Sequence, residues 1–449
     1  MSRFLNQNTH DKRGIILMYL LVFGSLLTTM LVTGVASYTL FEHRASEKKH
    51  DRDLAFQVAE AGINYYRWHL AHYPDDLQNG TTSTGPYVLP FRDKDGNTIG
   101  YYSLDISRPL VGSTIVEVRS TGYTTEAPNT QRTIAVRLGF PALADYTFLQ
   151  NANMRFSSTT IVHGPVHSNG GIRFDGTTDA IITSSRDTYD PGDGTGVHPG
   201  VWGAGGPTNF FSFPVPASDF NSITVDLANL QTSAINGGVR ILSSGREGWH
   251  ITFRSDARFE LRRVNSRITY DGVAYDYNGQ TYYGIYNMPA NGALFVEDNV
   301  WVDGIVDGRV TIGASNFQGA ADRDIIISGN LMYETQAGDD VLGLIAERDI
   351  VVPKNVPNTM TINAAAIAQN GRIFRPYYSG TNAVRTNLVF SGAQIAFNGG
   401  GWKWVNGSGV VVSGFVNTNH SYDGNLRFYP PPGFPTSGVY ELLSWEEAE

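Results

Sequence analysis

The chain has 449 residues, a formal net charge of −9, no cysteine and 49 glycines, and only 17% of its residues are charged. The lack of cysteine excludes disulfides, thiol catalysis and thiolate metal sites. The negative charge, without any concentrated basic stripe, argues against nucleic acid as a partner. Abundant glycine and an aromatic content of 12% are typical of a β-rich, turn-rich extracellular protein.

The first predicted element is a long helix. Residues 15–41 contain no charged side chain and at about 1.5 Å per residue would cover ~40 Å, more than the ~30 Å hydrocarbon layer of a membrane. Because no proline follows before Pro74, we predict one continuous helix from Ile15 to just before that residue. Its second half carries apolar residues at alternating steps of four and three, which predicts a stripe packed on a folded domain. The stripe consists of Leu54, Val58, Ala61, Tyr65 and Trp68.

The segment before this helix is short and basic. It contains Arg3, Lys12 and Arg13 but only one acid, Asp11. The positive-inside rule therefore places the N-terminus in the cytoplasm and everything after Phe41 outside. A secretory signal peptide would carry its small-residue cleavage site beyond the apolar stretch, whereas here the processing-like junction precedes it.

A basic leader that ends in Gly14 and is followed by a long uncharged helix resembles a type IV prepilin. The segment LAFQVAEAGINYYRWHL, residues 54–70, is similar to the post-membrane helix of PilX-like minor pilins and of the large tip pseudopilin of type II secretion. The resemblance covers a leader at 1–14 and a transmembrane and pilin helix at 15–75. It implies cleavage by a prepilin peptidase between Gly14 and Ile15.

Two residues depart from the pilin pattern. The first residue after the expected cleavage is Ile15, where Phe is usual. Counted from Ile15, the fifth residue is Tyr19, where most pilins carry a glutamate. In the family that glutamate is thought to pair with the free N-terminal amine of the preceding subunit, because an unpaired charge in lipid is costly. The departure favours a position at the filament tip, including a role in initiating assembly. The alternative is an ordinary single-pass anchor in which Gly14 and Tyr19 have no special role.

Residues 76–140 are predicted to form a small antiparallel sheet that the helix covers, which is the pilin-like module. Its four strands are YVLPF, IGYYSLDIS, STIVEVRSTGY and QRTIAVRLGF, and their alternation indicates one covered face. The first hairpin contains Asp93, Lys94, Asp95, Gly96 and Asn97. A full calcium-loop pattern is missing, which favours an Asp-Gly turn over a calcium site.

Residues 141–449 change character. Short apolar β-branched runs such as ALFVED, DIIISGN and NLVFSGAQIAF alternate with Gly, Asn and Asp, which predicts a β-solenoid or parallel β-helix. Because no strict period is detectable, a β-sandwich is the alternative. The predicted fold class is thus α+β and mostly β.

An irregular insertion is predicted near residues 184–290. It combines a Gly- and Pro-rich loop, a short helix from Ser218 to Ala234 that Ser218 would cap, and an antiparallel meander. The C-terminal tail contains Pro430, Pro431 and Pro432, which cannot donate ladder hydrogen bonds and therefore predict a cap that ends the stack.

No catalytic or metal site is predicted. His163 and His167 are four apart, but Gly164 and Pro165 exclude a helix there, and positions four apart in a strand are about 13 Å distant. The pair Asp339-Asp340 invites comparison with polygalacturonases, whose remaining acid, histidine and Arg-x-Lys partners are missing here. We therefore expect no enzyme activity and no cofactor.

Aromatic residues offer a candidate ligand site. Trp402 and Trp404 alternate on a glycine-flanked strand, and Tyr377 and Tyr378 lie nearby in sequence. Exposed aromatic rings can stack on sugars or on a partner surface. The alternative is that they fill the end of the solenoid.

The sequence therefore predicts a non-enzymatic minor or tip pilin of a type IV pilus or related filament, displaying an adhesive or interaction domain at the cell surface. Its expected partners are other pilin subunits, the pilus assembly platform, prepilin peptidase, the inner membrane and a surface glycan or neighbouring-cell receptor, with no nucleic acid. Before assembly it would be a single-pass protein of the cytoplasmic membrane. The alternatives are a membrane-anchored glycan-active β-helix enzyme and a scaffold that primes pilus assembly without an external ligand.

Overall fold

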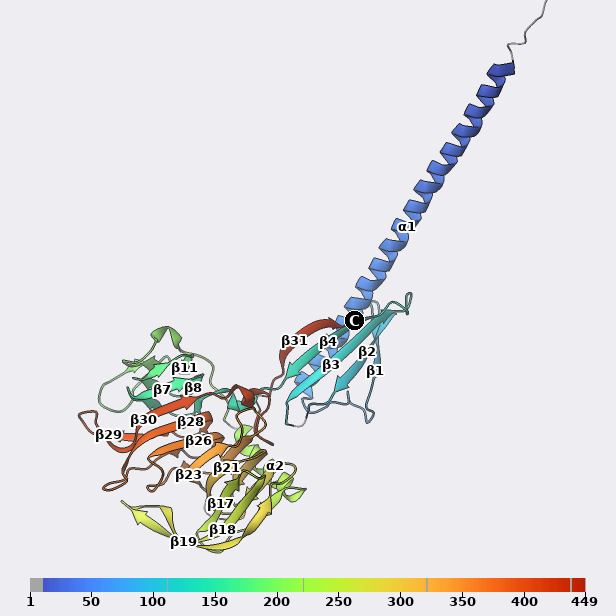
Figure 1. Ribbon diagram of the computed structural model, residues 1–449. Coiled ribbons are helices and arrows are strands. Elements are labelled where there is room, and N and C mark those ends of the chain that lie inside the picture. Colours follow the sequence, from blue (N-terminus) through green and yellow to red (C-terminus); the bar gives the residue numbers. More distant parts are fainter. Residues whose placement is uncertain (1–10, 111, 221, 320–321, 437, 449) are drawn as a thin grey trace, which may run out of the picture. The chain divides into compact units, whose positions relative to one another are not determined.

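Figure 1 shows the computed structural model of the protein. It describes residues 11–110, 112–220, 222–319, 322–436 and 438–448, with the backbone alone for residues 11–13 and 222–226. Residues 1–10 of the predicted leader lie outside the described residues. The chain forms two compact units: unit 1 contains residues up to 107, 117–137 and 442 onward, and unit 2 contains residues 108–116 and 138–441.

Unit 1 begins with helix α1 (Asp11–His72), which confirms the prediction of one continuous helix. Every side chain from Gly14 to His50 is exposed, and this stretch is long and apolar enough to cross a membrane. Five hydroxyl side chains in it bond to carbonyls of the preceding turn, which satisfies them without water. They are those of Ser25, Thr28, Thr29, Thr33 and Thr39.

A five-stranded sheet lies under the second half of α1 (Figure 1). Its strands follow the order β1-β2-β3-β4-β31, and β1, β2 and β3 pair antiparallel. The bounds are β1 (Tyr87–Arg92), β2 (Thr98–Ser107), β3 (Ile115–Thr124), β4 (Arg132–Gly139) and β31 (Glu441–Ala448). The four strands predicted from the sequence are thus confirmed.

The last strand corrects the predicted domain boundary. We expected all residues from 141 to 449 in the β-rich passenger, but β31 returns to unit 1 and lies beside β4. Trp445 meets Phe56 of α1 edge-on, with ring centres 5.8 Å apart, and Glu447 forms an ion pair with Arg132. Unit 2 is therefore an insertion within the sheet unit. Nothing in the local pattern of ELLSWEE could reveal which sheet it joins, because pairing between strands far apart in the sequence leaves no local signal.

The predicted helix stripe is rotated by about one residue from the observed one. Val58 is buried, but Leu54, Ala61 and Tyr65 are half-buried and Trp68 is 55% exposed. The prediction favoured large side chains, whereas small ones allow the closest approach to the sheet. The buried face consists of Ala55, Val58, Ala59, Gly62, Ile63, Tyr66, His69 and Leu70.

Two glycines make this close packing possible. A Cβ atom on Gly122 of β3 would lie 2.3 Å from both the Ala55 carbonyl oxygen and the Ala59 nitrogen. A Cβ on Gly62 would lie 2.3 Å from the Ser120 hydroxyl oxygen. The helix backbone thus rests directly on β3, and neither side can accept even a methyl group without moving.

The substitution Gly122→Ala should detach α1 locally from the sheet. Because the clash is with helix backbone, we expect a loss of roughly 1–3 kcal/mol, as for other overpacked cores. Amide hydrogen exchange of the full chain in detergent micelles should show residues 55–70 exchanging about tenfold faster or more. Gly407→Ala, where a Cβ meets nothing within 4 Å, is the matched control. Unchanged protection in Gly122→Ala would contradict this packing.

Unit 2 is built from parallel β-ladders, with helix α2 (Ser222–Ile235) against one of them. The longest ladder joins ten strands, each parallel to its neighbour. In stacking order these are β16 (Val239–Ile241), β20 (Ala293–Val296), β22 (Arg309–Ala314), β24 (Val341–Ala346), β26 (Thr359–Ala368), β28 (Val384–Ala396), β5 (Phe148–Gln150), β8 (Val166–Ser168), β11 (Ile182–Ser184) and β15 (Phe211–Ser212).

Further parallel ladders run alongside. One joins β17 (Gly248–Arg254), β21 (Val300–Val306), β23 (Ile325–Tyr333), β25 (Ile350–Val351) and β27 (Ile373–Phe374). Another runs from β23 through β26 and β28 to β30 (Val411–Ser421), β7 (Thr160–His163) and β10 (Thr177–Thr178). A third joins β6 (Met154–Phe156), β9 (Ile172–Phe174) and β14 (Val201–Trp202). Apolar side chains between the ladders form two buried clusters, one within residues 241–415 and one within residues 148–201. The antiparallel β-sandwich alternative does not fit these ladders.

The order of stacking differs from the order of the sequence. The N-terminal strand β5 pairs with the C-terminal β28, and β7 pairs with β30. The chain therefore begins the ladder in the middle of the stack, at β5, and adds strands outward to β15. The next strand, β16, lies at the opposite end of the stack. From there the strands are added inward to β28, which pairs with β5. The seam where β28 meets β5 brings residues near 150 beside residues near 400.

Part of the predicted insertion at 184–290 belongs to the parallel ladders. The meander is confirmed, because β17, β18 (Arg258–Tyr270) and β19 (Val273–Asn287) pair antiparallel, yet β16 and β17 also belong to the parallel ladders. The remaining short pair is β12 (Thr188–Tyr189) with β13 (His198–Pro199). The predicted cap at Ser218 is wrong: helix α2 begins at Ser222, and Ser218 is instead hydrogen-bonded to the Asn169 side chain.

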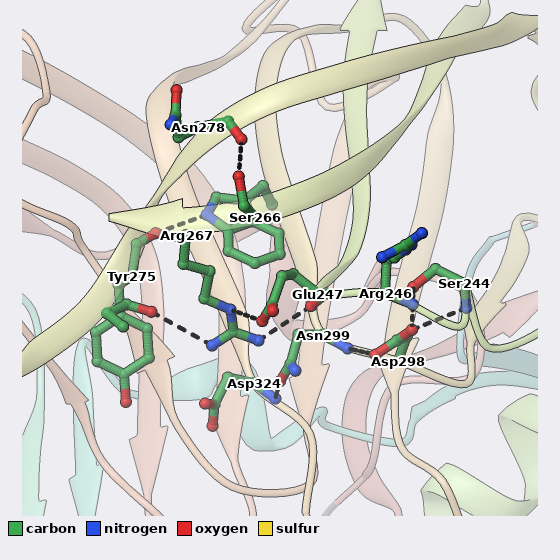
Figure 2. A network of polar contacts seen from close by, with 12 residues as sticks. Ser244, Arg246, Glu247, Ser266, Arg267, Tyr275, Asn278, Asp298, Asn299 and Asp324 are labelled. Atoms are coloured by element: carbon green, nitrogen blue, oxygen red, sulfur yellow. Dashed lines mark hydrogen bonds and ion pairs between the residues drawn. The ribbon is translucent and has the colours of Figure 1, made fainter. Parts of the chain in front are cut away.

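Polar contacts tie the turn end of the β18–β19 hairpin to the segment just before β17 (Figure 2). The Arg267 guanidinium pairs with the Glu247 carboxylate at 3.0 Å and donates to the Glu247 carbonyl oxygen at 3.0 Å. Nearby, the Asp298 carboxylate accepts hydrogen bonds from the Ser244 nitrogen and hydroxyl, and the Asn299 side chain accepts one from the Asp324 nitrogen. These groups have structural partners, so they form a brace and not a reactive cluster.

The proline-rich tail does not end the stack as predicted. The Arg309 guanidinium donates to the carbonyl oxygens of Tyr429, Pro430 and Gly112, and the Thr311 hydroxyl donates to the Pro432 carbonyl oxygen. Arg309 and Thr311 belong to β22, which lies inside a ladder between β20 and β24. The tail therefore covers the side of the stack, with its carbonyl groups satisfied by β22.

Candidate functional site

The residues proposed for processing and assembly lie on the exposed half of α1. A Cβ on Gly14 would meet nothing within 4 Å, Ile15 is half-exposed and Tyr19 is 67% exposed. No acidic residue occurs between Ile15 and Phe41. Residues 15–41 thus present an uncharged surface with no partner among the described residues. Tyr19 provides no carboxylate that could pair with the amine of another subunit.

The four candidate aromatic residues separate into two exposed and two buried ones. Tyr377 and Trp404 are each nearly half exposed and meet edge-on, with ring centres 6.2 Å apart. Tyr378 is fully buried, with the guanidinium carbon of Arg375 5.2 Å from its ring centre. Trp402 is buried beside Phe390, and its indole nitrogen donates to the Gln394 side chain at 3.1 Å. Tyr378 and Trp402 therefore have structural roles, which leaves Tyr377 and Trp404 as the accessible pair.

Both tryptophans line a cavity of about 300 Å³ in unit 2, at the seam where β28 meets β5. Its apolar wall is formed by Phe148, Met154, Phe156, Ile373 and Phe374. Its polar and charged lining is formed by Gln150, Arg155, Ser157, Thr160, Arg372, Lys403, Thr418 and His420. Among the lining residues that the structure describes there are three cations and no carboxylate.

A glycine run keeps the cavity open. Residues 399–401 lie in its lining just before strand β29 (Lys403–Val405). A Cβ on Gly400 would lie 2.1 Å from the Ile373 carbonyl oxygen, so this position excludes any side chain, whereas Gly401 faces open space. The run thus brings the chain against β27 without filling the cavity.

Trp404 is fixed by the buried residue Arg375. The indole nitrogen of Trp404 donates to the Arg375 carbonyl oxygen at 3.1 Å. The Arg375 guanidinium itself donates to the carbonyl oxygens of Ala383, Asn382 and Lys354. Burial lowers the pKa of Arg375 to about 10, and its hydrogen bonds are all to neutral carbonyl groups. Since these bonds order the segment, Trp404 is held as a rigid ring at the cavity.

Two titratable groups in the cavity are strongly affected by burial. The Lys403 ammonium donates to the Thr159 hydroxyl at 2.7 Å and the Val416 carbonyl oxygen at 2.9 Å, and burial lowers its pKa to about 8. The His420 pKa falls to about 3, first because of burial and second because of the nearby Lys403 charge. The Gln394 amide donates to His420 Nδ1 at 3.0 Å, so neutral His420 carries its proton on Nε2.

Sequence reasoning missed most of this cavity. It selected Trp402 and Trp404 but not the cationic and amide groups, which come from widely separated segments of the chain. Lys403 lies between the two tryptophans, and NGGGWKW was the one local signal available for it. Arg155, Gln150 and His420 are scattered along the chain, and only the pairing of β28 with β5 brings them together.

The rejected metal and acid/base candidates have ordinary structural partners. His163 pairs with Asp179 at 2.6 Å on β7, whereas His167 of β8 bonds to the Thr183 hydroxyl and the Asn169 side chain. Asp340 accepts three hydrogen bonds, from the Gly308 nitrogen and from the Thr335 nitrogen and hydroxyl. Within the described residues, no group of three His, Asp or Glu side chains could hold a metal ion.

The Asp-Gly turn predicted at residues 93–97 is an Asx turn. The Asp93 carboxylate accepts hydrogen bonds from the Asp95 and Asn97 nitrogens and from the Asn97 side chain. These bonds, with that from Asn97 first, lower the Asp93 pKa. The carboxylate therefore stabilises the turn between β1 and β2, as the Asp-Gly interpretation predicted.

No protein-family model matches the chain, and no curated protein matches it. Among solved structures, the chain is similar to the competence-associated pilin ComZ from Thermus thermophilus, at 14% sequence identity and a TM-score of 0.31. The comparison covers 89% of this chain and 97% of that chain. A TM-score of this size does not establish a shared fold, and the similarity contributes nothing to the functional assignment.

Neutral His420 should make the protein sensitive to mild acid. Its pKa is about 3 when folded and about 6.5 when unfolded, so below pH 6.5 the unfolded state binds a proton that the folded state does not. This contribution to stability is complete above pH 6.5 and is lost as the pH falls toward 3. Between pH 6 and pH 4 the unfolding free energy should fall by up to about 1.4 kcal/mol per pH unit from this group alone.

The measurement is urea unfolding of the full chain in detergent micelles, followed by circular dichroism at several pH values. His420→Gln keeps a polar partner for Gln394 but cannot titrate. The slope of its unfolding free energy against pH should therefore be smaller than that of the parent, by the contribution of about one bound proton. Equal slopes for the two proteins would show that His420 is not held neutral by burial.

Proposed function

We propose that this chain is a non-enzymatic, pilin-like subunit of a type IV pilus or related filament. The observation that carries the proposal is the division of α1 into two environments: the uncharged residues 15–41 are exposed throughout, whereas the face from Ala55 to Leu70 packs on the sheet of the same unit. A helix with an uncharged exposed half needs lipid or other apolar helices around it. Before assembly the cytoplasmic membrane supplies these surroundings, and afterwards the helices of neighbouring subunits do so.

The proposed location follows the chain direction. The basic residues before Ile15 stay in the cytoplasm, and both compact units are exported. Prepilin peptidase removes the leader after Gly14, and the assembly platform then moves the subunit from the membrane into the filament. Unit 2 is displayed at the cell surface as an adhesive or interaction domain. The post-membrane helix resembles that of PilX-like minor pilins and that of the large tip pseudopilin of type II secretion.

A position at the filament end has two supports. Tyr19 cannot supply the carboxylate that would neutralise the amine of a preceding subunit, and no other acid exists between Ile15 and Phe41. Unit 2, inserted between β4 and β31, is also far larger than the sheet that carries it, so repeated stacking within a shaft would require room for it at every level. A single terminal subunit avoids both problems and serves to initiate assembly.

We also infer that unit 2 is a β-solenoid. Its parallel ladders stack strand upon strand, and the side chains of successive coils are buried in clusters between the ladders. Such a domain is rigid and carries its loops and cavities along its sides. This rigidity suits a domain that must present a binding surface outside the cell.

Processing tests the pilin assignment. Intact-mass measurement of protein extracted from membranes should show that residues 1–14 are absent and that Ile15 is the first residue. Gly14→Val should retain the leader, because the peptidase requires the small residue before its cleavage site. Gly24→Val changes a second helix glycine with equally open surroundings and should leave processing unaffected. Recovery of the full leader in cells with active prepilin peptidase would overturn the assignment.

A further inference from the structure

The cavity at the β28–β5 seam combines three features that together define a ligand class. It presents an accessible aromatic ring, an excess of positive charge, and buried neutral polar groups. Its volume of about 300 Å³ lies at the lower end of the range for ligand sites, which is roughly 300–1,000 Å³. A single ring-sized unit would occupy it.

The charge in the cavity is unbalanced. The Arg372 guanidinium carbon lies 4.1 Å from the Phe374 ring centre, and among the described residues Arg372 forms no ion pair. The Asp349 carboxylate accepts a hydrogen bond from the Arg372 backbone nitrogen at 2.7 Å but lies outside the cavity lining, which contains no carboxylate among the described residues. The planar Arg372 guanidinium can bind a ligand carboxylate with two parallel hydrogen bonds.

The other two cations add to this excess. Lys403 uses two of its three N–H groups on Thr159 and Val416, which leaves one donor. Arg155 has only a long contact, 3.8 Å, with Asp193. An anionic group inside the cavity would therefore meet positive charge from more than one strand.

The aromatic surface suits a sugar ring. Trp404 is 45% exposed, and its bond to the Arg375 carbonyl oxygen and its contact with Tyr377 fix its plane. The apolar faces of sugar rings stack on such exposed indole rings, and a ring held in place loses little conformational freedom on binding. Open space at Gly401 leaves the approach to the cavity free of side chains.

The neutral polar groups supply partners for hydroxyls. Gln150 is 5% exposed, and within the described part of the chain its buried side-chain carbonyl oxygen accepts no hydrogen bond. A buried polar atom without a partner is costly, so a ligand hydroxyl that reached this amide would be favoured. His420, whose Nε2 carries the proton, lines the same cavity. The cavity therefore offers both an acceptor and a donor to a polyhydroxylated ligand.

We propose that this cavity binds a uronic-acid residue of an acidic glycan, with Trp404 stacking on the sugar ring and Arg372 pairing with its carboxylate. The proposal rests on the display role of unit 2 and names its ligand class. A nucleic acid is disfavoured because the chain carries a net charge of −9 and the cations are confined to one small cavity. An uncharged glycan would leave Arg372 and Lys403 without an ion-pair partner.

The test measures binding of the purified full chain in detergent micelles by isothermal titration calorimetry. The probes are short oligomers of galacturonate, glucuronate and mannuronate, each compared with its methyl ester, which keeps the rings but removes the charge. We expect at least one acidic oligomer to bind tenfold or more tightly than its ester. Arg372→Gln should abolish this preference, whereas Arg246→Gln, an exposed arginine outside the cavity lining, should retain it.

Trp404→Ala separates stacking from charge. It should weaken binding of acid and ester alike by about tenfold, and circular dichroism of both variants should match the parent because both side chains are accessible. The proposal is overturned if no oligomer binds, if acids bind no better than esters, or if a single-stranded DNA oligonucleotide binds more tightly than every acidic oligomer. None of these outcomes depends on filament assembly, so a failure here leaves the leader-cleavage result unaffected, and the reverse also holds.

Discussion

An apolar helix surface that the protein does not cover itself determines the rest of this structure. Residues 15–41 of α1 carry no charge and are exposed along their whole length, and the hydroxyl groups of Thr28, Thr29 and Thr33 bond back to their own helix. Water is a poor environment for such a surface, because each buried methylene group is worth about 0.8 kcal/mol. Lipid or other apolar helices would cover this surface, and under the proposed function the membrane supplies that cover before assembly and neighbouring subunits supply it afterwards.

The other half of α1 has the opposite property. Ala55, Ala59 and Gly62 bring its backbone onto β3, where Gly122 has no side chain to separate them. Close contact between backbones leaves little freedom for sliding or rotation, so the sheet is fixed to the helix. The return of β31 to this sheet means that the chain leaves unit 1 after β4 and re-enters it at its end. Unit 2 is therefore connected to the helix-bearing unit through both of its own chain ends.

The sequence predicted the elements well and their pairing poorly. The helix and the strands β1 to β4 have strong local patterns, and their bounds were predicted to within a few residues. Strand β31 was assigned to the wrong unit because the whole of unit 2 separates it in sequence from its partner β4. The stripe on α1 was misplaced by one position because aromatic residues such as Trp68 resemble core residues, whereas the true contact depends on alanine and glycine.

The same limit applies to the cavity. The aromatic pair Trp402 and Trp404 could be selected because it stands beside three glycines, and one of the two is accessible as predicted. Gln150 and Arg155 carry no such signal, since ordinary surface residues look the same in sequence. Only the out-of-order joining of β28 to β5 places them beside Lys403. A stack built in sequential order would have put these residues at opposite ends.

The central claim, that this chain is a filament subunit placed at one end, is tested most directly by locating it. Filaments from cells that produce the natural chain should be labelled with gold-conjugated antibodies against unit 2 and viewed by electron microscopy. A subunit placed at one end should give about one cluster of label per filament, at a single end. Label distributed along the shaft would contradict the terminal position, and filaments without any label would contradict the assignment as a filament subunit.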